Sequence, residues 1–309
     1  LVKAKQGDIS RINVYGQEKE AATYRLAKMN LALRGISHNL GSESDSTFTN
    51  DLHKGLYFDY IMANPPFNLK AWRTEEQLTK DIRWSGYGLP PVSNANYAWI
   101  LHMLSKLEVT HGIAGFLLAN GALSDDDSVN IRQKLIENDK VEAIIVLPRN
   151  MFYSTDISVT LWILNQNKKG GFWHGRQQRS REGEILFMDL RTWNENIYEK
   201  KYVQFLPEQI EKVVEIYHRW QADGTDGTNF AEPELYRSVD IDEIKANGWS
   251  LVPSRYIEFV DRDTNIDYEN VMSEASKTVA SLLARQEAND AALRKAFATL
   301  GFKLETKVK

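Results

Sequence analysis

The chain has 309 residues, and hydrophobic and charged residues make up 42% and 26% of it. These shares are typical of soluble globular proteins and exclude disordered and collagen-like chains. No apolar run reaches the roughly 18 residues that a membrane-spanning helix needs, which argues against a membrane protein. The formal net charge is -4, so bulk charge alone does not indicate nucleic-acid binding. Cysteine is absent, which excludes disulfides, thiolate metal sites and a cysteine nucleophile, and no metal site is predicted.

The amino-terminal part predicts one helix and one strand. The start, Leu1-Val2-Lys3-Ala4-Lys5, shows no signal or transit peptide, so a cytoplasmic location is expected, and the non-Met first residue suggests a fragment or a processed form. From residue 18 to 34 apolar side chains recur at helical spacing up to Gly35, which predicts an amphipathic helix. Residues 36–55 resemble a loop. The aromatic and apolar run 56–63 predicts a buried strand, because two prolines end it.

The middle of the chain alternates between helical and apolar segments. Helices are predicted at 95–107 and 129–138, and strands at 114–119, 141–147 and 157–164. This alternation is typical of an open α/β sheet. Because only nine residues separate the last two strands, their connection is predicted to be an antiparallel hairpin. Residues 167–183 resemble an exposed basic loop, and a further strand at 184–190 is expected to close the sheet.

The remaining part is predicted to be helical. Helices are expected at 207–221, near 240–246 and at 268–300. We therefore predict a catalytic domain over residues 1–200 and a helical region over 201–309. The last helix has a narrow apolar seam, as in helices that pack on a partner, although packing within the chain would give the same pattern.

The tetrapeptide Asn64-Pro65-Pro66-Phe67 directly follows the predicted strand 56–63. Open α/β sheets bind ligands at the carboxyl ends of their strands, so the motif lies where a site is expected. An ordinary turn is the alternative, because Asn and Pro favour turns for backbone reasons alone.

The same four residues suit methylation of an exocyclic amino group on a nucleic-acid base. Such a nitrogen is a poor nucleophile because its lone pair is conjugated into the ring. The Asn64 side-chain carbonyl and a proline backbone carbonyl can accept hydrogen bonds from the amine and favour a pyramidal nitrogen. The two prolines hold these acceptors rigid, and Phe67 can stack on a base turned out of the duplex.

The chain resembles the DNA adenine-N6 methyltransferases with an (N/D)PP(Y/F) motif, and more narrowly the modification (M) subunit of type I restriction-modification systems. The resemblance extends over about residues 8–260. It implies a Rossmann-like S-adenosylmethionine-dependent methyltransferase fold, with a mixed, mostly parallel α/β sheet, an antiparallel hairpin and a carboxy-terminal helical region. Five further segments carry it: Tyr15-Gly16-Gln17-Glu18, Asn94-Ala95-Asn96-Tyr97-Ala98-Trp99, Ala119-Asn120-Gly121-Ala122-Leu123, Leu147-Pro148-Arg149-Asn150-Met151-Phe152-Tyr153 and Ser254-Arg255-Tyr256.

The resemblance also implies roles for individual residues. The catalytic motif would be Asn64, Pro65, Pro66 and Phe67, with Asn64 also next to the cofactor, S-adenosyl-L-methionine. Glu18 would bind the ribose hydroxyls of the cofactor, although a Glu that opens a helix is the alternative. Asp45 is the candidate acid near the cofactor adenine, and Asp51 is its rival.

One feature of the family is not found in this sequence. Members carry a Gly-rich loop after their first strand that contacts the methionine end of the cofactor, and it should precede Tyr15. Only 14 residues precede Tyr15, and Gly7 is the one glycine among them. The chain therefore resembles the family's carboxy-terminal part, without the helical amino-terminal domain and the first strand, and we expect residues 1–309 alone to bind the cofactor poorly or not at all.

The implied partners are double-stranded DNA, a specificity subunit, a second M subunit and, where restriction accompanies modification, a restriction subunit. A partner that reads the DNA would reconcile the net charge of -4 with a DNA substrate. The helix at 268–300 is the candidate docking element for the specificity subunit.

Several other functions stay open. Cytosine-N4 methylation needs the same amine activation, although those enzymes more often begin the motif with Ser. A catalytically incomplete interaction module that docks to a specificity subunit is a second alternative, and methylation of RNA or protein is a third. The lack of cysteine excludes cytosine-C5 methylation, in which a thiolate attacks the ring.

Overall fold

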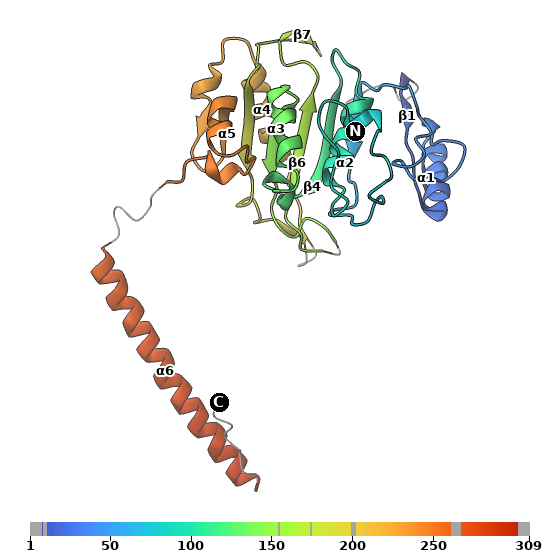
Figure 1. The fold of residues 1–309 in the computed structure, drawn as a ribbon. Helices are drawn as coiled ribbons and strands as arrows, with labels where there is room; N and C mark the ends of the chain where they lie inside the picture. The colour runs from blue at the N-terminus through green and yellow to red at the C-terminus, as the bar shows by residue number, and fades with distance from the viewer. Residues whose placement is uncertain are drawn as a thin grey trace. The chain divides into compact units, whose positions relative to one another are not determined.

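The computed structural model describes residues 8, 11–153, 155–173, 175–198, 202–260 and 267–301. The chain divides into two compact units, Leu1–Glu258 and Phe259–Lys309. The centre of the first unit is a seven-stranded sheet covered by helices (Figure 1).

The central sheet is mixed. Neighbouring strands lie in the order β12 (Ala231–Glu232), β13 (Tyr236–Asp240), β9 (Glu184–Asp189), β5 (Val141–Val146), β6 (Val159–Asn165), β4 (Ile113–Ala119) and β3 (Tyr60–Ala63). β6 and β13 run antiparallel to both of their neighbours, and the other five strands share one direction. The predicted mixed α/β fold and the β5–β6 hairpin are thus confirmed, but four of the six neighbouring strand pairs are antiparallel, so the pairing is not mostly parallel.

Helices cover both faces of this sheet. Alternate residues of β5 enter two separate core clusters, Ile144 and Val146 in one and Ala143 and Ile145 in the other. The first cluster includes residues of α2 (Asn96–Lys106), α3 (Val129–Glu137) and α5 (Ile241–Ala246), and the second includes residues of α4 (Pro207–Gln221). Figure 1 shows α2 and α3 crossing in front of the strands. Because both faces are covered, all six residues of β5 are buried.

The division between the two units lies elsewhere than the predicted boundary at residue 200. β13 pairs with β9 along five residues, and α4 packs on the sheet through Ile216 and Trp220. These contacts attach the segment up to Glu258 to the first unit. β13 was not predicted, because its polar residues Arg237, Ser238 and Asp240 interrupt the apolar pattern.

A small second sheet lies at the end of the first unit that also carries α1 (Figure 1). It consists of β1 (Asn13–Tyr15) and β2 (Ser37–Asn39), which run parallel. The region 36–55, expected to be a loop, therefore contains a short strand.

One burial prediction at this end is wrong, and one predicted helix is more exposed than its amphipathic pattern indicates. In α1 (Ala21–Leu33) the apolar side chains at helical spacing are exposed, and Leu33 is 77% exposed. The predicted buried strand is β3, the last strand of the sheet, where Met62 is 78% exposed. The helix and the strand are both present, but no other described residue buries the apolar side chains named here.

The predicted exposed basic loop 167–183 is also different in the structure. It contains a short hairpin of β7 (Gly171–Trp173) and β8 (Arg176–Gln178). Lys168 is 3% exposed and Arg181 is fully buried. The Arg181 guanidinium donates to the buried Glu142 carboxylate, with 3.1 Å between Nε and Oε1. The buried Glu142 carboxylate thus compensates the charge of Arg181, a residue that was predicted to lie in solvent. Nor does β9 close the sheet, because β13 lies beyond it.

Short elements complete the first unit. They are β10 (Ile197–Tyr198), β11 (Tyr202–Val203), and the 3-10 turns η3 (Ile82–Trp84), η4 (Asn120–Leu123), η5 (Gly227–Asn229) and η6 (Pro253–Arg255).

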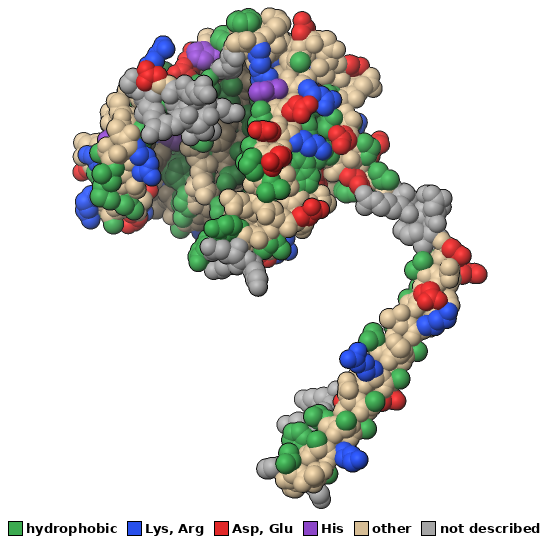
Figure 2. All heavy atoms as spheres, turned by 180° about the vertical axis from the view of Figure 1, so that it is seen from behind, with side chains coloured by type: hydrophobic (Ala, Val, Ile, Leu, Met, Phe, Trp, Pro, Cys, Tyr) green, Lys and Arg blue, Asp and Glu red, His purple; other side chains and the backbone are tan. Residues whose placement is uncertain are grey.

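The second unit contains the predicted long helix, α6 (Tyr268–Thr299). The Asp267 side chain caps its amino terminus by accepting from the backbone N–H of Asn270. None of its residues is buried, and Figure 2 shows hydrophobic side chains along its length. Among the described helices, none is long and apolar enough to cross a membrane.

Candidate active site

The Asn-Pro-Pro-Phe motif begins directly after β3, at the edge of the sheet where the parallel strand β4 also ends. Asn64 and Pro66 are exposed, Pro65 is buried, and Phe67 is partly buried. The proline rings fix the backbone dihedral φ, so the motif leaves the strand in a rigid conformation. The Asn64 side chain is therefore accessible to a ligand at this edge.

A second aromatic ring lies against the motif. The Phe67 and Phe152 ring centroids are 5.8 Å apart, with 65° between the ring planes. Phe152 belongs to the connection between β5 and β6, which ends at the same edge of the sheet as the motif. Both rings are partly buried and retain accessible surface. The carboxyl edge thus presents an exposed amide beside two aromatic rings.

Three asparagines hold the chain that follows the motif. Asn68 has a φ of 53°, a left-handed conformation that Asn tolerates better than most residues. Its backbone N–H donates to the Asn96 side-chain oxygen at 3.1 Å, and its own side-chain oxygen accepts from the amides of Asn96 and Asn94 at 2.9 and 3.2 Å. Asn96 is 3% exposed and lies at the start of α2. The exit from the motif is therefore fixed to a core helix.

The two predicted cofactor acids lie next to each other. Glu18 follows β1, and the backbone N–H of Asp45 donates to the Glu18 carbonyl at 3.0 Å. The Gln17 side-chain amide also donates to the Asp45 carbonyl, at 3.1 Å. The Glu18 carboxylate accepts from the backbone N–H of Glu20 at 2.9 Å. The structure thus brings together two acids that lie far apart in the sequence.

The carboxylate of Asp45 is itself oriented by hydrogen bonds. The Asn50 side-chain amide donates to it at 2.7 Å and the backbone N–H of Ser46 donates at 2.6 Å. The bond from Asn50, and then that from Ser46, lower the pKa of Asp45. Asp45 is therefore ionised at neutral pH and is only partly buried.

Asp51, the rival acid, has a structural partner. Its carboxylate lies 2.5 Å from the Lys106 ammonium and accepts from the backbone N–H of His53 at 3.0 Å. Burial raises the pKa of Asp51, but the hydrogen bonds from Lys106 and His53 outweigh it and lower the pKa overall. Because Lys106 belongs to α2, this pair fastens the loop to the core.

Two further residues contact the candidate site: Phe152, whose ring lies against Phe67, and Arg83, which donates to the backbone carbonyls of Thr47 and Phe48. The sequence predicts Phe152 only as part of the segment 147–153, and it predicts no role for Arg83. An aromatic residue in the loop after a core strand is a signal that could have found Phe152. The sequence gives no comparable signal for Arg83, because its partners lie on a distant loop.

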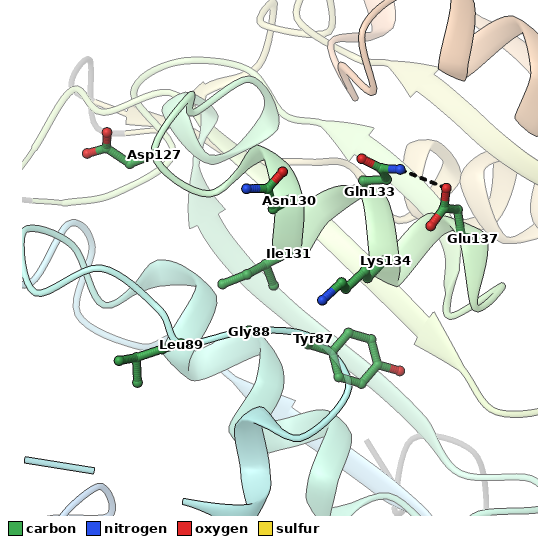
Figure 3. Close-up of a pocket in the computed structure, with 9 residues that line it drawn as sticks. All are labelled: Tyr87, Gly88, Leu89, Asp127, Asn130, Ile131, Gln133, Lys134 and Glu137. Carbon is green, nitrogen blue, oxygen red and sulfur yellow. Dashed lines mark hydrogen bonds between the residues drawn. The ribbon is translucent and has the colours of Figure 1, made fainter. Parts of the chain in front are cut away.

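A cavity of about 380 Å³ lies elsewhere, between α3 and the loop before α2 (Figure 3). It is lined by Tyr87, Gly88, Leu89, Asp127, Asn130, Ile131, Gln133, Lys134 and Glu137. None of the predicted site residues is among them. The candidate active site is thus defined by its side chains and not by this cavity.

Within the part of the chain that the structure describes, no group of three or more His, Asp or Glu side chains could hold a metal ion. The candidate site offers an amide, aromatic rings and separate carboxylates, which suit an organic ligand.

Comparison with known proteins identifies the family. The model of the N-6 DNA Methylase family matches residues 1–264. The HindI methylase subunit of a type I restriction enzyme from Haemophilus influenzae is 35% identical over 308 residues, covering 98% of this chain and 65% of the relative. The MjaIX methylase subunit from Methanocaldococcus jannaschii is 32% identical over 300 residues, covering 96% of this chain and 51% of the relative.

A solved structure agrees with these matches. The type I restriction-modification methyltransferase subunit from Streptococcus thermophilus superposes with a TM-score of 0.65 and 25% identity, covering 79% of this chain and 48% of that one. The chain thus spans between about half and two thirds of the length of these proteins. Since the family model matches most of the sequence, the chain belongs to the N-6 DNA methylase family.

Proposed function

We propose that this chain belongs to the modification subunit of a type I restriction-modification system and methylates adenine N6 in double-stranded DNA with S-adenosyl-L-methionine. The observation that carries the proposal is the accessible Asn64 at the carboxyl end of β3, beside the Phe67–Phe152 ring pair. Membership of the N-6 DNA methylase family and the relatives among type I methylase subunits support it. The soluble composition supports a cytoplasmic location.

The motif would bind and orient the target amine. The Asn64 side-chain oxygen and the Pro65 carbonyl accept one hydrogen bond each from the adenine amino group, which directs the nitrogen lone pair away from the ring plane. Phe67 and Phe152 offer ring surface on which an extruded base can stack. As the new N–C bond formed, the bond between the methyl group and the cofactor sulfur would break, S-adenosyl-L-homocysteine would leave, and the nitrogen would lose a proton to solvent. No enzyme nucleophile would take part.

The acids after β1 and β2 fit the proposed cofactor. S-Adenosyl-L-methionine supplies an electrophilic methyl group, and its ribose hydroxyls and adenine amine are hydrogen-bond donors that carboxylates accept. Glu18 and Asp45 are held next to each other, whereas the Asp51 carboxylate is engaged by Lys106. These contacts favour Asp45 over Asp51 as the acid near the cofactor adenine.

Substitution of Asn64 by Ala in the full-length protein tests the catalytic assignment. Because Asn64 is exposed, the fold should survive, while loss of one positioned acceptor should lower the methylation rate about 100-fold or more. Transfer of a labelled methyl group to DNA measures the rate. Asn30→Ala, an exposed position in α1, is the matched control. Full activity of Asn64→Ala would contradict the proposal, and N4-methylcytosine in the product would favour the cytosine alternative.

We also propose that α6 docks on helices of a specificity subunit, which would supply the sequence recognition. A helix of 32 residues with no buried side chain and apolar residues at helical spacing is suited to a helical partner. The apolar residues include Met272, Val279, Leu282 and Leu293. Leu282→Asp should abolish co-purification with the specificity subunit, whereas Ser281→Asp should not; equal capture of both variants would refute the assignment.

A further inference from the structure

We propose that Arg83 is a positioning residue for the cofactor, because it fixes the loop 44–50 that carries Asp45. This inference rests on the proposed function and assigns a role to a residue outside both the catalytic motif and the acids. Arg83 lies in η3, within the segment that connects the motif to α2. It therefore joins the cofactor side of the site to the substrate side.

The contacts of Arg83 span these two parts of the chain. Its guanidinium donates to the backbone carbonyls of Thr47 at 3.0 Å and Phe48 at 2.6 Å. Both carbonyls belong to the turn between Asp45 and Asn50, which are themselves joined by a side-chain hydrogen bond. Since Arg83 is 8% exposed, water cannot readily replace it as the donor.

Other groups hold the guanidinium in this orientation. The Asp81 carboxylate accepts from Nε at 2.8 Å and from Nη2 at 2.7 Å. His102 Nδ1 lies 3.1 Å from Nη1 on the side of α2. A planar fork with five N–H groups can serve a carboxylate, two carbonyls and an imidazole together. A lysine ammonium has three donors at a single point and cannot do the same.

The side chain of Phe48 makes a second contact between the same two parts. Its ring centroid lies 4.7 Å from Trp72, which is in the segment after the motif, and 4.1 Å from Trp99 of α2. Phe48 is 4% exposed. The loop is thus held by its backbone through Arg83 and by its side chain through Phe48, and Asp45 lies at the base of this anchored turn.

A loop fixed before the ligand arrives binds it without a further ordering cost. Without Arg83, the carbonyls of Thr47 and Phe48 lose their donor and the turn should sample other positions, of which only some present Asp45 correctly. The expected consequence is weaker cofactor binding, with little change in the chemical step once the cofactor is bound.

The test compares Arg83→Lys with Arg132→Lys in the full-length protein. Arg132 is 2% exposed and also donates to two backbone carbonyls, those of Trp249 and Asp125, away from the cofactor loop. Calorimetric titration with S-adenosyl-L-methionine and steady-state methylation give Kd, KM and kcat. For Arg83→Lys we expect Kd and KM to rise about tenfold with kcat within about twofold of wild type. For Arg132→Lys, Kd and KM should stay unchanged.

A double substitution separates positioning from a general loss of stability. If Arg83 acts through Asp45, Arg83→Lys should weaken cofactor binding much less in an Asp45→Ala background than in the wild-type background. Should Arg83→Lys fail to fold, Phe48→Leu disturbs the same turn from its other contact and should show the same rise in KM.

Two results would overturn the inference: unchanged cofactor affinity in a folded Arg83→Lys, or equal effects of Arg83→Lys with and without Asp45. A wild-type protein that neither binds the cofactor nor methylates DNA would instead refute the proposed function.

Discussion

The middle of the central sheet and the end that carries β1 and β3 are stabilised in different ways. In the middle, all six residues of β5 are buried and two hydrophobic clusters cover its faces. At the other end, no residue of β1 or β3 is fully buried. There, the connecting loops are held by buried ion pairs and hydrogen bonds, such as Lys106–Asp51 and Arg83–Asp81.

Most of the candidate site residues lie at the end of the sheet that is held by polar contacts. Glu18, Asp45 and Asn64 all lie at the end with β1 and β3, whereas the middle contributes Phe152 through a loop. Apolar burial is non-directional, so it stabilises a sheet without fixing the orientation of a polar loop. Hydrogen bonds to a guanidinium or an amide are directional and can fix it. The molecule therefore uses apolar packing for stability and polar contacts for the geometry of the site.

The sharpest test of this comparison is Trp162→Ala in β6. Trp162 is fully buried, stacks on Phe116 at 6.2 Å and meets the edge of Tyr97 at 6.3 Å. Loss of the indole should lower the free energy of unfolding by about 3–5 kcal/mol, measured by urea unfolding. Phe172→Ala, at a position 71% exposed, is the control and should change it by less than about 0.5 kcal/mol.

The cofactor affinity of folded Trp162→Ala should equal that of wild type, because the ring contacts of the indole are with Phe116 in β4 and Tyr97 in α2, outside the loops of the site. A large loss of affinity without a loss of stability would contradict the division of roles between the two regions.

A second test uses pH to perturb the polar end through His102. His102 lies beside Arg83, and burial first, then the Arg83 charge, lower its pKa from 6.5 to about 4. The unfolded chain therefore takes up a proton at higher pH than the folded one. The stabilising effect of neutral His102 is complete above pH 6.5 and is lost as the pH falls toward 4. The free energy of unfolding should fall by about 3 kcal/mol over this window.

His102→Asn keeps an acceptor for Arg83 but does not titrate, so the fall should largely disappear when urea unfolding is measured across the window. His218→Asn, at an exposed position in α4, is the control and should retain the wild-type profile. Identical profiles for His102→Asn and wild type would show that His102 is accessible to solvent protons in the folded state.

The two regions also differ in how well the sequence predicts them. In the middle, β5 and α3 were predicted to within one or two residues, because apolar periodicity records the burial of each element directly. The burial of Arg181 could not be predicted, since its partner, Glu142, lies in another strand. A charged residue is predicted to be exposed to solvent unless the partner that neutralises it is known.

At the candidate site, Asn64 and Phe67 can be predicted from the sequence because the chemistry proposed for them belongs to one short motif. The roles of Arg83 and Phe152 depend on contacts between distant segments, which no local pattern records. The adjacency of Glu18 and Asp45 likewise depends on a backbone hydrogen bond between separate loops. Local sequence patterns can therefore predict candidate groups for reaction or binding, and the structure is needed to find the residues that hold them in place.

The smallest expected effect concerns the exposed apolar face of α1. Leu33 is 77% exposed, so Leu33→Ala removes little buried surface and should change the free energy of unfolding of residues 1–309 by less than about 0.5 kcal/mol. Ile136→Ala in α3, a side chain 1% exposed, is the matched control and should cost about 2–5 kcal/mol. A loss of more than about 1 kcal/mol for Leu33→Ala would contradict the comparison, because side chains outside the core do not usually have such effects. The same substitution in the full-length protein then asks whether another segment covers this face: a larger loss there than in residues 1–309 would identify α1 as a packing surface, and equal small losses would leave it a solvent-facing one.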